Sequence, residues 1–223
     1  SKFNFAPTEL SKQNLLKEGK DPASIYVTGN TAIDALKTTV RENYTHPELE
    51  WAKDSRLIMI TAHRRENLGD PMIQIYKTIR RVMDEHPDVK AIYPIHLNPA
   101  VRETANEYLG NDDRIHIIEP LDVLDFHNFL SRSYLILTDS GGIQEEAPSL
   151  GKPVLVMRDT TERPEGIAAG TLKLVGTEEE TIYKEFSRLL SDKDEYEAMS
   201  KASNPYGDGH ACERFADILA EKL

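Results

Sequence analysis

A Ser-Gly-Gly turn, Ser140-Gly141-Gly142, separates a predicted buried strand from a predicted helix. The unpaired N–H groups and the positive dipole end at a helix start attract anions, and glycines let phosphate oxygens approach the backbone. Glu146 lies about one helical turn further along, where its carboxylate can accept hydrogen bonds from ribose hydroxyls. The alternative is a plain Ser cap on a tight turn. The preceding strand and the following acid together favour a nucleotide site.

A His-Arg-Arg sequence, His63 to Arg65, follows the next informative strand, residues 57–61. Ligands bind at the carboxyl edge of open α/β sheets, so these side chains should lie beside the phosphate turn. Histidine titrates near neutrality, which favours a functional role for His63. A solvated loop paired with Glu66 is the alternative, and for Arg65 it is the better interpretation.

Three further side chains could join this site. His96 follows the predicted strand 91–95, although a structural histidine is an equal alternative. Arg163 precedes Pro164, a residue that favours a helix start, and its guanidinium could clamp a pyrophosphate. Phe126 could stack on a base or pack in the core. The sequence has no metal-ligand spacing, Walker loop or G-x-G-x-x-G motif, so we expect no metal and no nicotinamide cofactor.

Alternating strands and helices must position these residues. Short apolar runs predict strands at 57–61, 91–95, 115–118, 134–138, 154–157 and 172–175. Apolar residues at three- and four-residue spacing predict helices at 72–85, 100–109, 123–131 and 142–150. This pattern predicts a doubly wound, Rossmann-like α/β domain with a parallel sheet.

The termini differ from this pattern. A short amphipathic helix begins at Thr8 and ends at Gly19, and a strand at 25–27 follows. One helix and one strand cannot bury their apolar faces alone. We therefore expect residues 1–40 to be the remnant of a preceding domain, 41–55 a polar linker, and 56–207 the nucleotide-binding domain. Residues 208–223 include a final amphipathic helix.

Composition limits the classes of partner. The chain has 223 residues and a formal net charge of −11. An acidic protein is a poor general nucleic-acid binder, and no apolar run is long enough to span a membrane. Cys212 is the only cysteine, so no intrachain disulfide can form. With no secretion signal at the N-terminus, we expect a cytoplasmic protein.

Four stretches in this order and spacing resemble the bacterial non-hydrolysing UDP-N-acetylglucosamine 2-epimerases, and the resemblance covers essentially the whole chain. The stretches begin at Thr28 (TGNT), Thr61 (TAHRREN), Asp139 (DSGGIQEEAP) and Arg158 (RDTTERPE). The resemblance implies one half of a GT-B arrangement, in which two Rossmann-like domains face each other. It implies that the N-terminal domain is missing, that the C-terminal helix would cross back to it, and that family members are usually homodimers. This piece could be monomeric.

The resemblance also implies roles for the site residues. The diphosphate of UDP would bind at Ser140, Gly141 and Gly142, the ribose at Glu146, the uracil against Phe126, and a phosphate at Arg163. His63 would act at the UDP leaving group, by proton transfer or by stabilising developing charge. A second, regulatory UDP-N-acetylglucosamine site would involve Arg64 and His96.

The implied reaction inverts C2 of UDP-N-acetylglucosamine by eliminating UDP and adding it back, without a cofactor. The family's catalytic carboxylates belong to the missing domain, so we expect this chain to bind UDP and to be inactive alone. A GT-B glycosyltransferase, a hydrolysing epimerase that releases free N-acetylmannosamine, and a non-catalytic nucleotide-sugar binding module remain alternatives.

Overall fold

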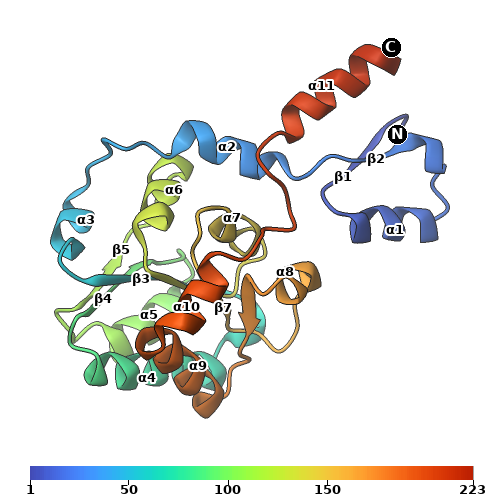
Figure 1. Cartoon of the computed structure of the whole chain (residues 1–223). Coiled ribbons are helices and arrows are strands. Elements are labelled where there is room, and N and C mark those ends of the chain that lie inside the picture. The colour runs from blue at the N-terminus through green and yellow to red at the C-terminus, as the bar shows by residue number, and fades with distance from the viewer. Residues whose placement is uncertain (223) are drawn as a thin grey trace.

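A computed structural model describes residues 1–222, and its centre is a parallel sheet of six strands (Figure 1). The strands lie in the order β5-β4-β3-β6-β7-β8 and every neighbouring pair is parallel. Their bounds are β3 Arg56–Thr61, β4 Val89–Pro94, β5 Ile115–Ile118, β6 Leu135–Thr138, β7 Val154–Val156 and β8 Leu172–Leu174. These six are the strands that the apolar runs predicted, within two residues at each end.

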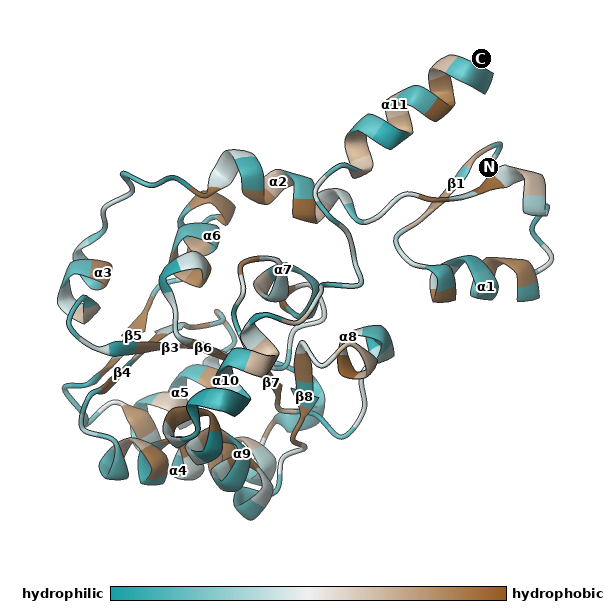
Figure 2. Ribbon diagram, in the orientation of Figure 1, coloured by the Kyte–Doolittle hydropathy of each residue, from teal (hydrophilic) through white to brown (hydrophobic). Residues whose placement is uncertain are grey.

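The strands are mostly apolar because both faces of the sheet are covered. Along β3, Ile58 and Ile60 pack into one core cluster, whereas Leu57 and Met59 pack into the other. Successive side chains on a strand point to opposite faces, so a sheet with two cores needs continuous apolar sequence. Figure 2 shows the hydrophobic strands between two layers of helices that are hydrophilic outside.

Helices form a layer on each face. One core cluster contains residues of α4 (Asp70–Glu85), α5 (Pro99–Leu109) and α9 (Glu179–Ser191), and α10 (Lys193–Ser200) packs on α9. The other contains residues of α3 (Pro47–Ala52), α6 (Val123–Arg132) and α7 (Ile143–Ser149). The short α8 (Pro164–Ala168) precedes β8. This is the doubly wound, Rossmann-like arrangement that the sequence predicted.

Local caps set where several helices begin. The Asn98 side chain accepts from the Ala100 N–H at 3.1 Å, and Pro99 occupies the first turn of α5. Asp122 likewise caps α6 by accepting from the Asp125 N–H at 2.8 Å. Such side chains satisfy N–H groups that have no partner within the helix.

The strand order places a topological switch point between β3 and β6. From β3 the chain builds outward through β4 and β5, and it then returns to begin the other half at β6. The connections that leave β3 and β6 therefore depart to opposite faces, which opens a crevice at the carboxyl ends of these two strands. His63 and the Ser140 turn follow these strands directly.

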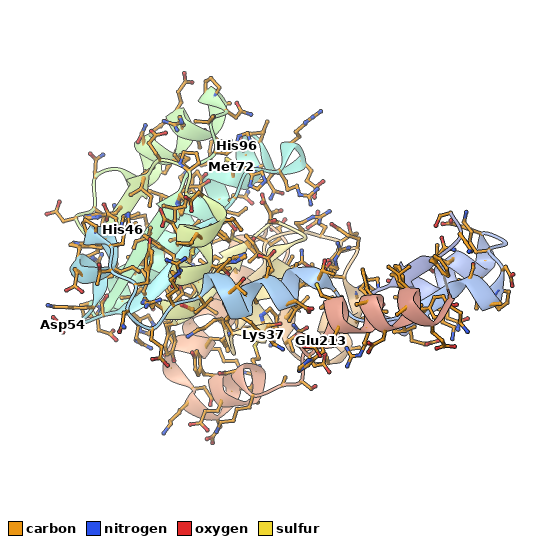
Figure 3. The ribbon with its side chains drawn as sticks, turned by 90° about the horizontal axis from the view of Figure 1, so that it is seen from above. Lys37, His46, Asp54, Met72, His96 and Glu213 are labelled. Atoms are coloured by element: carbon orange, nitrogen blue, oxygen red, sulfur yellow. The ribbon has the colours of Figure 1, made fainter. Side chains whose placement is uncertain are left out.

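A small unit lies apart from the main body (Figure 1). It consists of β1 (Asn4–Ala6), α1 (Glu9–Lys17) and β2 (Ile25–Val27), with β1 and β2 paired in parallel. The C-terminal helix α11 (Ala211–Lys222) lies against it, and the rings of Phe5 and Phe215 stack at 4.1 Å. Seen from above, in Figure 3, α11 and this unit extend to one side of the main body.

The structure divides the chain earlier than the predicted boundary at residue 40. Helix α2 (Thr31–Thr39) packs on α6 and α7, because Ile33 and Leu36 form a buried stripe. The predicted polar linker 41–55 contains α3, whose Leu49 and Ala52 enter the core. Two buried residues in six give too short an apolar pattern to distinguish this helix from a loop.

Two connections join the small unit to the main body side by side. The Asn30 N–H donates to the Tyr206 carbonyl at 2.8 Å, and Gly29 has a φ of +90°. A Cβ at Gly29 would stand 3.3 Å from the Gly207 Cα, so the close approach requires glycine.

Among residues 1–222, no helix is long and apolar enough to cross a membrane.

Candidate functional site

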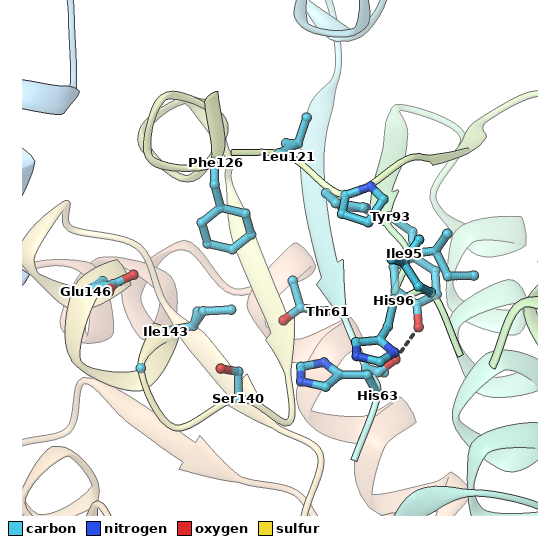
Figure 4. Close-up of a pocket in the computed structure, with 15 residues that line it drawn as sticks. Thr61, His63, Tyr93, Ile95, His96, Leu121, Phe126, Ser140, Ile143 and Glu146 are labelled. Atoms are coloured by element: carbon cyan, nitrogen blue, oxygen red, sulfur yellow. Dashed lines mark hydrogen bonds between the residues drawn. The ribbon is translucent and has the colours of Figure 1, made fainter. Parts of the chain in front are cut away.

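A cavity of about 560 Å³ opens at the carboxyl ends of β3, β4 and β6 (Figure 4). Its position is the crevice at the switch point, where open α/β sheets bind ligands, and its volume suits a small molecule. The lining residues are Thr61, Ala62, His63, Tyr93, Pro94, Ile95, His96, Leu97, Pro120, Leu121, Phe126, Ser140, Gly142, Ile143 and Glu146.

The structure brings most of the predicted site residues together here. Six of the nine line the cavity, from four separate segments of the chain: His63, His96, Phe126, Ser140, Gly142 and Glu146. Gly141, Arg64 and Arg163 do not line it. The cavity therefore lies at the predicted edge of the sheet, and Gly141 and the side chains of Arg64 and Arg163 lie outside its lining.

The turn after β6 has unpaired backbone amides beside the cavity, which Ser140 and Gly142 line. The N–H groups of Gly141 and Gly142 have no hydrogen-bond acceptor among residues 1–222. Gly142 is exposed and has helical dihedrals, φ −63° and ψ −43°, immediately before α7. The Ser140 N–H donates to Thr138 Oγ1 at 2.9 Å, and Thr138 in turn accepts from Thr61 at 2.6 Å. These bonds fix the turn at the ends of both strands.

Gly141 faces away from the cavity, toward Glu162. A Cβ at Gly141 would stand 2.7 Å from Glu162 Oε1, so the carboxylate occupies the space that a side chain would need. Arg64 lies on the same side of the turn. Its Nε donates to the Asp139 carbonyl at 3.1 Å and its terminal nitrogen is 3.5 Å from Glu162 Oε1. Glu162 also accepts from the buried Arg158 at 2.7 Å.

Glu146 reaches the cavity from α7, as its place one turn into the helix predicted. Its side chain is 19% exposed, and its Oε2 lies 3.6 Å from Nε2 of the buried His127. Its Oε1 lies 3.9 Å from the position of a Cβ on Gly142. The carboxylate and the turn amides therefore share one wall of the cavity, where a ligand can contact both.

Phe126 enters the cavity from α6, on the other side from the turn (Figure 4). It is partly buried and also packs against the core cluster that contains Phe129 and Ile143. Its position is thus compatible with both interpretations, a surface on which a base could stack and an aromatic residue of the core. The residue thus forms part of the apolar lining of the cavity.

Two histidines stack beyond the ends of β3 and β4. The rings of His63 and His96 are 5.1 Å apart and nearly parallel, at 6° (Figure 4). Burial lowers the pKa of His63, and His96 and Arg64 lower it further, while the Asp139 carboxylate acts in the opposite direction. The imidazole is consequently neutral at pH 7, and it can take up a proton when a negative ligand arrives.

Arg163 does not face the cavity, in contrast to the sequence prediction. Its Nε donates to the carboxylate of Glu145, a side chain that is only 7% exposed and that also accepts from Asn30. A buried carboxylate draws the nearest guanidinium, because an unpaired buried charge is costly. Helix α8 begins at Pro164, as the sequence predicted. The pairing of Arg163 with Glu145 was not predicted.

Sequence reasoning missed most of the apolar lining and one acid. Tyr93, Ile95, Leu121 and Ile143 line the cavity, yet their apolar runs only indicated strands and helices. Asp139 is fully buried at the end of β6, and its acidic type after an apolar strand was the available signal. No group of three or more potential metal ligands occurs within residues 1–222.

Comparison with known proteins connects this site to a family. A sequence model of the family described as UDP-N-acetylglucosamine 2-epimerase matches residues 1–220. The Bacillus subtilis UDP-N-acetylglucosamine 2-epimerase is 62% identical over 97% of this chain and 57% of its own length. The chain thus spans less than two thirds of this curated relative.

Solved structures agree. The S. aureus MnaA–UDP co-structure is 55% identical with a TM-score of 0.95, covering 98% of this chain and 60% of that one. The Neisseria meningitidis UDP-GlcNAc 2-epimerase bound to UDP-GlcNAc is 44% identical with a TM-score of 0.91, covering 100% of this chain and 62% of that one. With the family match over nearly its whole length, the chain belongs to the UDP-N-acetylglucosamine 2-epimerase family and forms one Rossmann-like half of its GT-B arrangement.

Proposed function

We propose that this chain is the UDP-binding half of an enzyme that converts UDP-N-acetylglucosamine to UDP-N-acetylmannosamine. One observation carries the proposal: free turn amides, a carboxylate and a histidine meet in one cavity at the switch point of the sheet. Relatives of 44% to 55% identity were solved with UDP-GlcNAc or UDP bound. The same fold and residue types support the same ligand here.

In this proposal the nucleotide lies along the cavity wall. The Gly142 amide and the Ser140 hydroxyl donate to the diphosphate, and the Glu146 carboxylate accepts from the ribose hydroxyls. Phe126 packs against the uracil. In this proposal the Gly141 amide, in the same turn, also donates to the diphosphate. Arg163 could reach a phosphate only by breaking its ion pair with Glu145, so we do not include it among the diphosphate-binding residues.

The chemistry divides between the two halves of the enzyme. A base removes the C2 proton, the C1–oxygen bond to UDP breaks, and 2-acetamidoglucal forms; UDP then adds back to C1 and a proton to the opposite face of C2. His63 stands beside the diphosphate, where its imidazolium donates to the departing oxygen and balances its charge. The carboxylates that remove and return the C2 proton lie in the other domain, in the part of the relatives that this chain does not cover. We expect the isolated chain to bind UDP and to lack epimerase activity.

A regulatory contact forms the second part of the proposal. His96 is exposed at the cavity rim and stacks on His63, and Arg64 lies beside the turn. We assign both to a second UDP-N-acetylglucosamine site between this half and the other domain. We also propose that the whole enzyme is a dimer, as the family resemblance implies. A cytoplasmic location fits the one cysteine, Cys212, which is a free and exposed thiol.

Calorimetry with UDP tests the binding claim on this chain. Wild type should bind, and Ser140→Ala and Glu146→Ala should each weaken binding without changing the melting temperature. Absence of UDP binding by the folded wild-type chain would contradict the proposal. In the whole enzyme, His63→Ala should abolish formation of the UDP-linked epimer. Free N-acetylmannosamine as the product would instead indicate a hydrolysing enzyme, and transfer to an acceptor a glycosyltransferase.

A further inference from the structure

The carboxylate of Asp139 is completely buried where β6 ends, beside the loop that carries His63. Its Oδ2 accepts three hydrogen bonds, from the backbone N–H of His63 at 2.9 Å, from that of Arg64 at 2.8 Å, and from Asn67 Nδ2 at 3.1 Å. These donors fix the carboxylate in one orientation. They also tie the loop after β3 to the end of β6.

The second oxygen of this carboxylate has no such partner. Asp139 Oδ1 is buried and receives no hydrogen bond from any of residues 1–222. The imidazole Nδ1 of His63 lies 3.6 Å from this oxygen. This is longer than a hydrogen bond, but a small rotation of the half-exposed ring would close it. An unsatisfied buried acceptor is costly, so the carboxylate favours an N–H at this position.

We propose that Asp139 is a positioning residue for His63: it holds the neutral imidazole as the Nδ1–H tautomer and directs an unprotonated Nε2 to the cavity. When Nε2 takes up a proton, the Asp139 carboxylate stabilises the imidazolium that results. This role rests on the proposed function, in which His63 serves the UDP leaving group. It adds a buried counter-ion that sets which nitrogen can accept and return a proton.

The other groups around His63 do not compete for this contact. His96 stacks on the ring, but its Nδ1 accepts from the Asn98 N–H at 3.1 Å. Arg64 turns toward Glu162 and the carbonyl of Asp139. Burial together with these neighbours lowers the pKa of His63, although Asp139 opposes the change. The free site therefore holds a neutral ring. A negative ligand beside it would raise the pKa of His63 and favour uptake of a proton from solvent.

The two buried tyrosines nearby are also committed. The hydroxyl of Tyr93 donates to the Ala62 carbonyl, and it lies 2.9 Å from the hydroxyl of Tyr76. With the Tyr93 proton on Ala62, the Tyr76 hydroxyl must donate to Tyr93. Neither hydroxyl is left to satisfy Asp139 Oδ1.

The arrangement has a consequence for ligand binding. A neutral ring with Nε2 as acceptor repels a phosphate oxygen, whereas the imidazolium donates to it. The diphosphate of a UDP-sugar should therefore bind together with one proton taken from solvent, which resides on Nε2. On elimination, that proton neutralises the oxygen released by breaking the C1–oxygen bond, and it returns to Nε2 when UDP adds back.

Nitrogen NMR of the histidine rings tests the tautomer without any ligand. Long-range proton–nitrogen correlations at pH 8 distinguish Nδ1–H from Nε2–H, and the signal absent in His63→Gln identifies His63. We expect Nδ1–H in wild type. In Asp139→Asn, the amide oxygen can keep the three loop donors while its NH2 faces Nδ1, so the ring should switch to Nε2–H.

Asn67→Ala is the matched control, because it removes one of the three donors to Oδ2 and leaves the carboxylate. It should keep the Nδ1–H tautomer, whereas a general loosening of the loop would affect both variants alike. A wild-type ring in the Nε2–H form, or an Asp139→Asn ring that stays Nδ1–H, would overturn the proposal. If Asp139→Asn does not fold, the wild-type spectrum alone still tests the proposal, because it shows which tautomer His63 adopts.

Calorimetry of UDP-N-acetylglucosamine in buffers of different ionisation enthalpy measures the proton uptake. This ligand is suitable because its diphosphate is esterified at both ends and does not titrate near neutrality. We expect uptake approaching about one proton per ligand in wild type near pH 7, from linkage, and none in Asp139→Asn or His63→Gln. Equal uptake in wild type and Asp139→Asn would refute the role of Asp139. Failure of the ligand to bind would refute the nucleotide function and leave the NMR result standing.

Discussion

Gly142→Ala should separate ligand binding from folding more cleanly than any other change at the site. Gly142 has helical dihedrals, and a Cβ there would meet only Glu146 Oε1, at 3.9 Å, in otherwise open space. Alanine at a compatible position stabilises a protein by about 0.4–1 kcal/mol through the entropy of the unfolded chain. For a domain of this size, the melting temperature should stay the same or rise by up to about 4 °C.

Binding should change in the opposite direction. Gly142 lines the cavity, so the new methyl group would stand between the turn amides and a diphosphate. Loss of one charge-assisted hydrogen bond costs about 1.5–3 kcal/mol, which corresponds to roughly 10- to 150-fold weaker UDP binding. Isothermal calorimetry with UDP measures the affinity, and calorimetric unfolding of the same samples measures stability.

Gly141→Ala is the matched control, since the neighbouring glycine faces Glu162 instead of the cavity. Its Cβ would stand 2.7 Å from Glu162 Oε1 and would force that carboxylate to shift from Arg158 and Arg64. The melting temperature should fall for Gly141→Ala and not for Gly142→Ala. Unchanged UDP affinity in a folded Gly142→Ala protein would show that the diphosphate does not approach this turn, and the site assignment would fail.

Four further outcomes follow from the same geometry. Glu146→Gln should weaken UDP binding about 10-fold or more by removing a charged acceptor, whereas the same change at the exposed Glu103 should have no effect. Phe126→Ala should cost about 1–3 kcal/mol of UDP affinity if the ring stacks on the base, as titration would show. Phe186→Ala, at a fully buried ring between α9 and the sheet, should cost about 3–5 kcal/mol in denaturant unfolding with no specific loss of binding. The pKa of His63 is lower in the folded than in the unfolded chain, so the unfolded chain takes up the proton first as pH falls below about 6.5. Wild type should therefore lose more thermal stability than His63→Gln between pH 7.5 and pH 5. An equal loss in the two proteins would contradict the lowered pKa of His63.

Local pattern was sufficient for the six strands of the sheet and for helices α4, α5, α6 and α7, whereas α9 and α10 were not predicted. A strand buried on both faces needs a nearly continuous apolar run, and β3, β4 and β6 contain such runs at 57–60, 91–93 and 135–137. Parallel strands end at one edge, so residues directly after β3, β4 and β6 had to come together. This rule alone placed His63, His96 and Ser140 around one cavity.

Long-range competition between partners was beyond local pattern. Arg163 follows a strand as the other site residues do, but the buried Glu145 captures its guanidinium. The burial of α2 and α3 depends on surfaces supplied by α6, α7 and the sheet, and these surfaces exist only after folding. The pairing of β1 with β2 likewise joins residues 21 positions apart in the sequence.

The sequence by itself determined the parallel α/β architecture, the edge of the sheet at which the site lies, and the side of α7 from which Glu146 faces the turn. The architecture and the edge follow from continuous apolar runs and from the common edge at which parallel strands end, and the placement of Glu146 follows from the 3.6-residue period of a helix. All three are local properties of the chain. Only the tertiary structure decided which charged groups pair: Asp139 with the His63 loop, Glu162 with Arg64 and Arg158, and Glu145 with Arg163. Electrostatic pairing depends on distance through space and on burial, and neither is encoded in the spacing of residues along the chain.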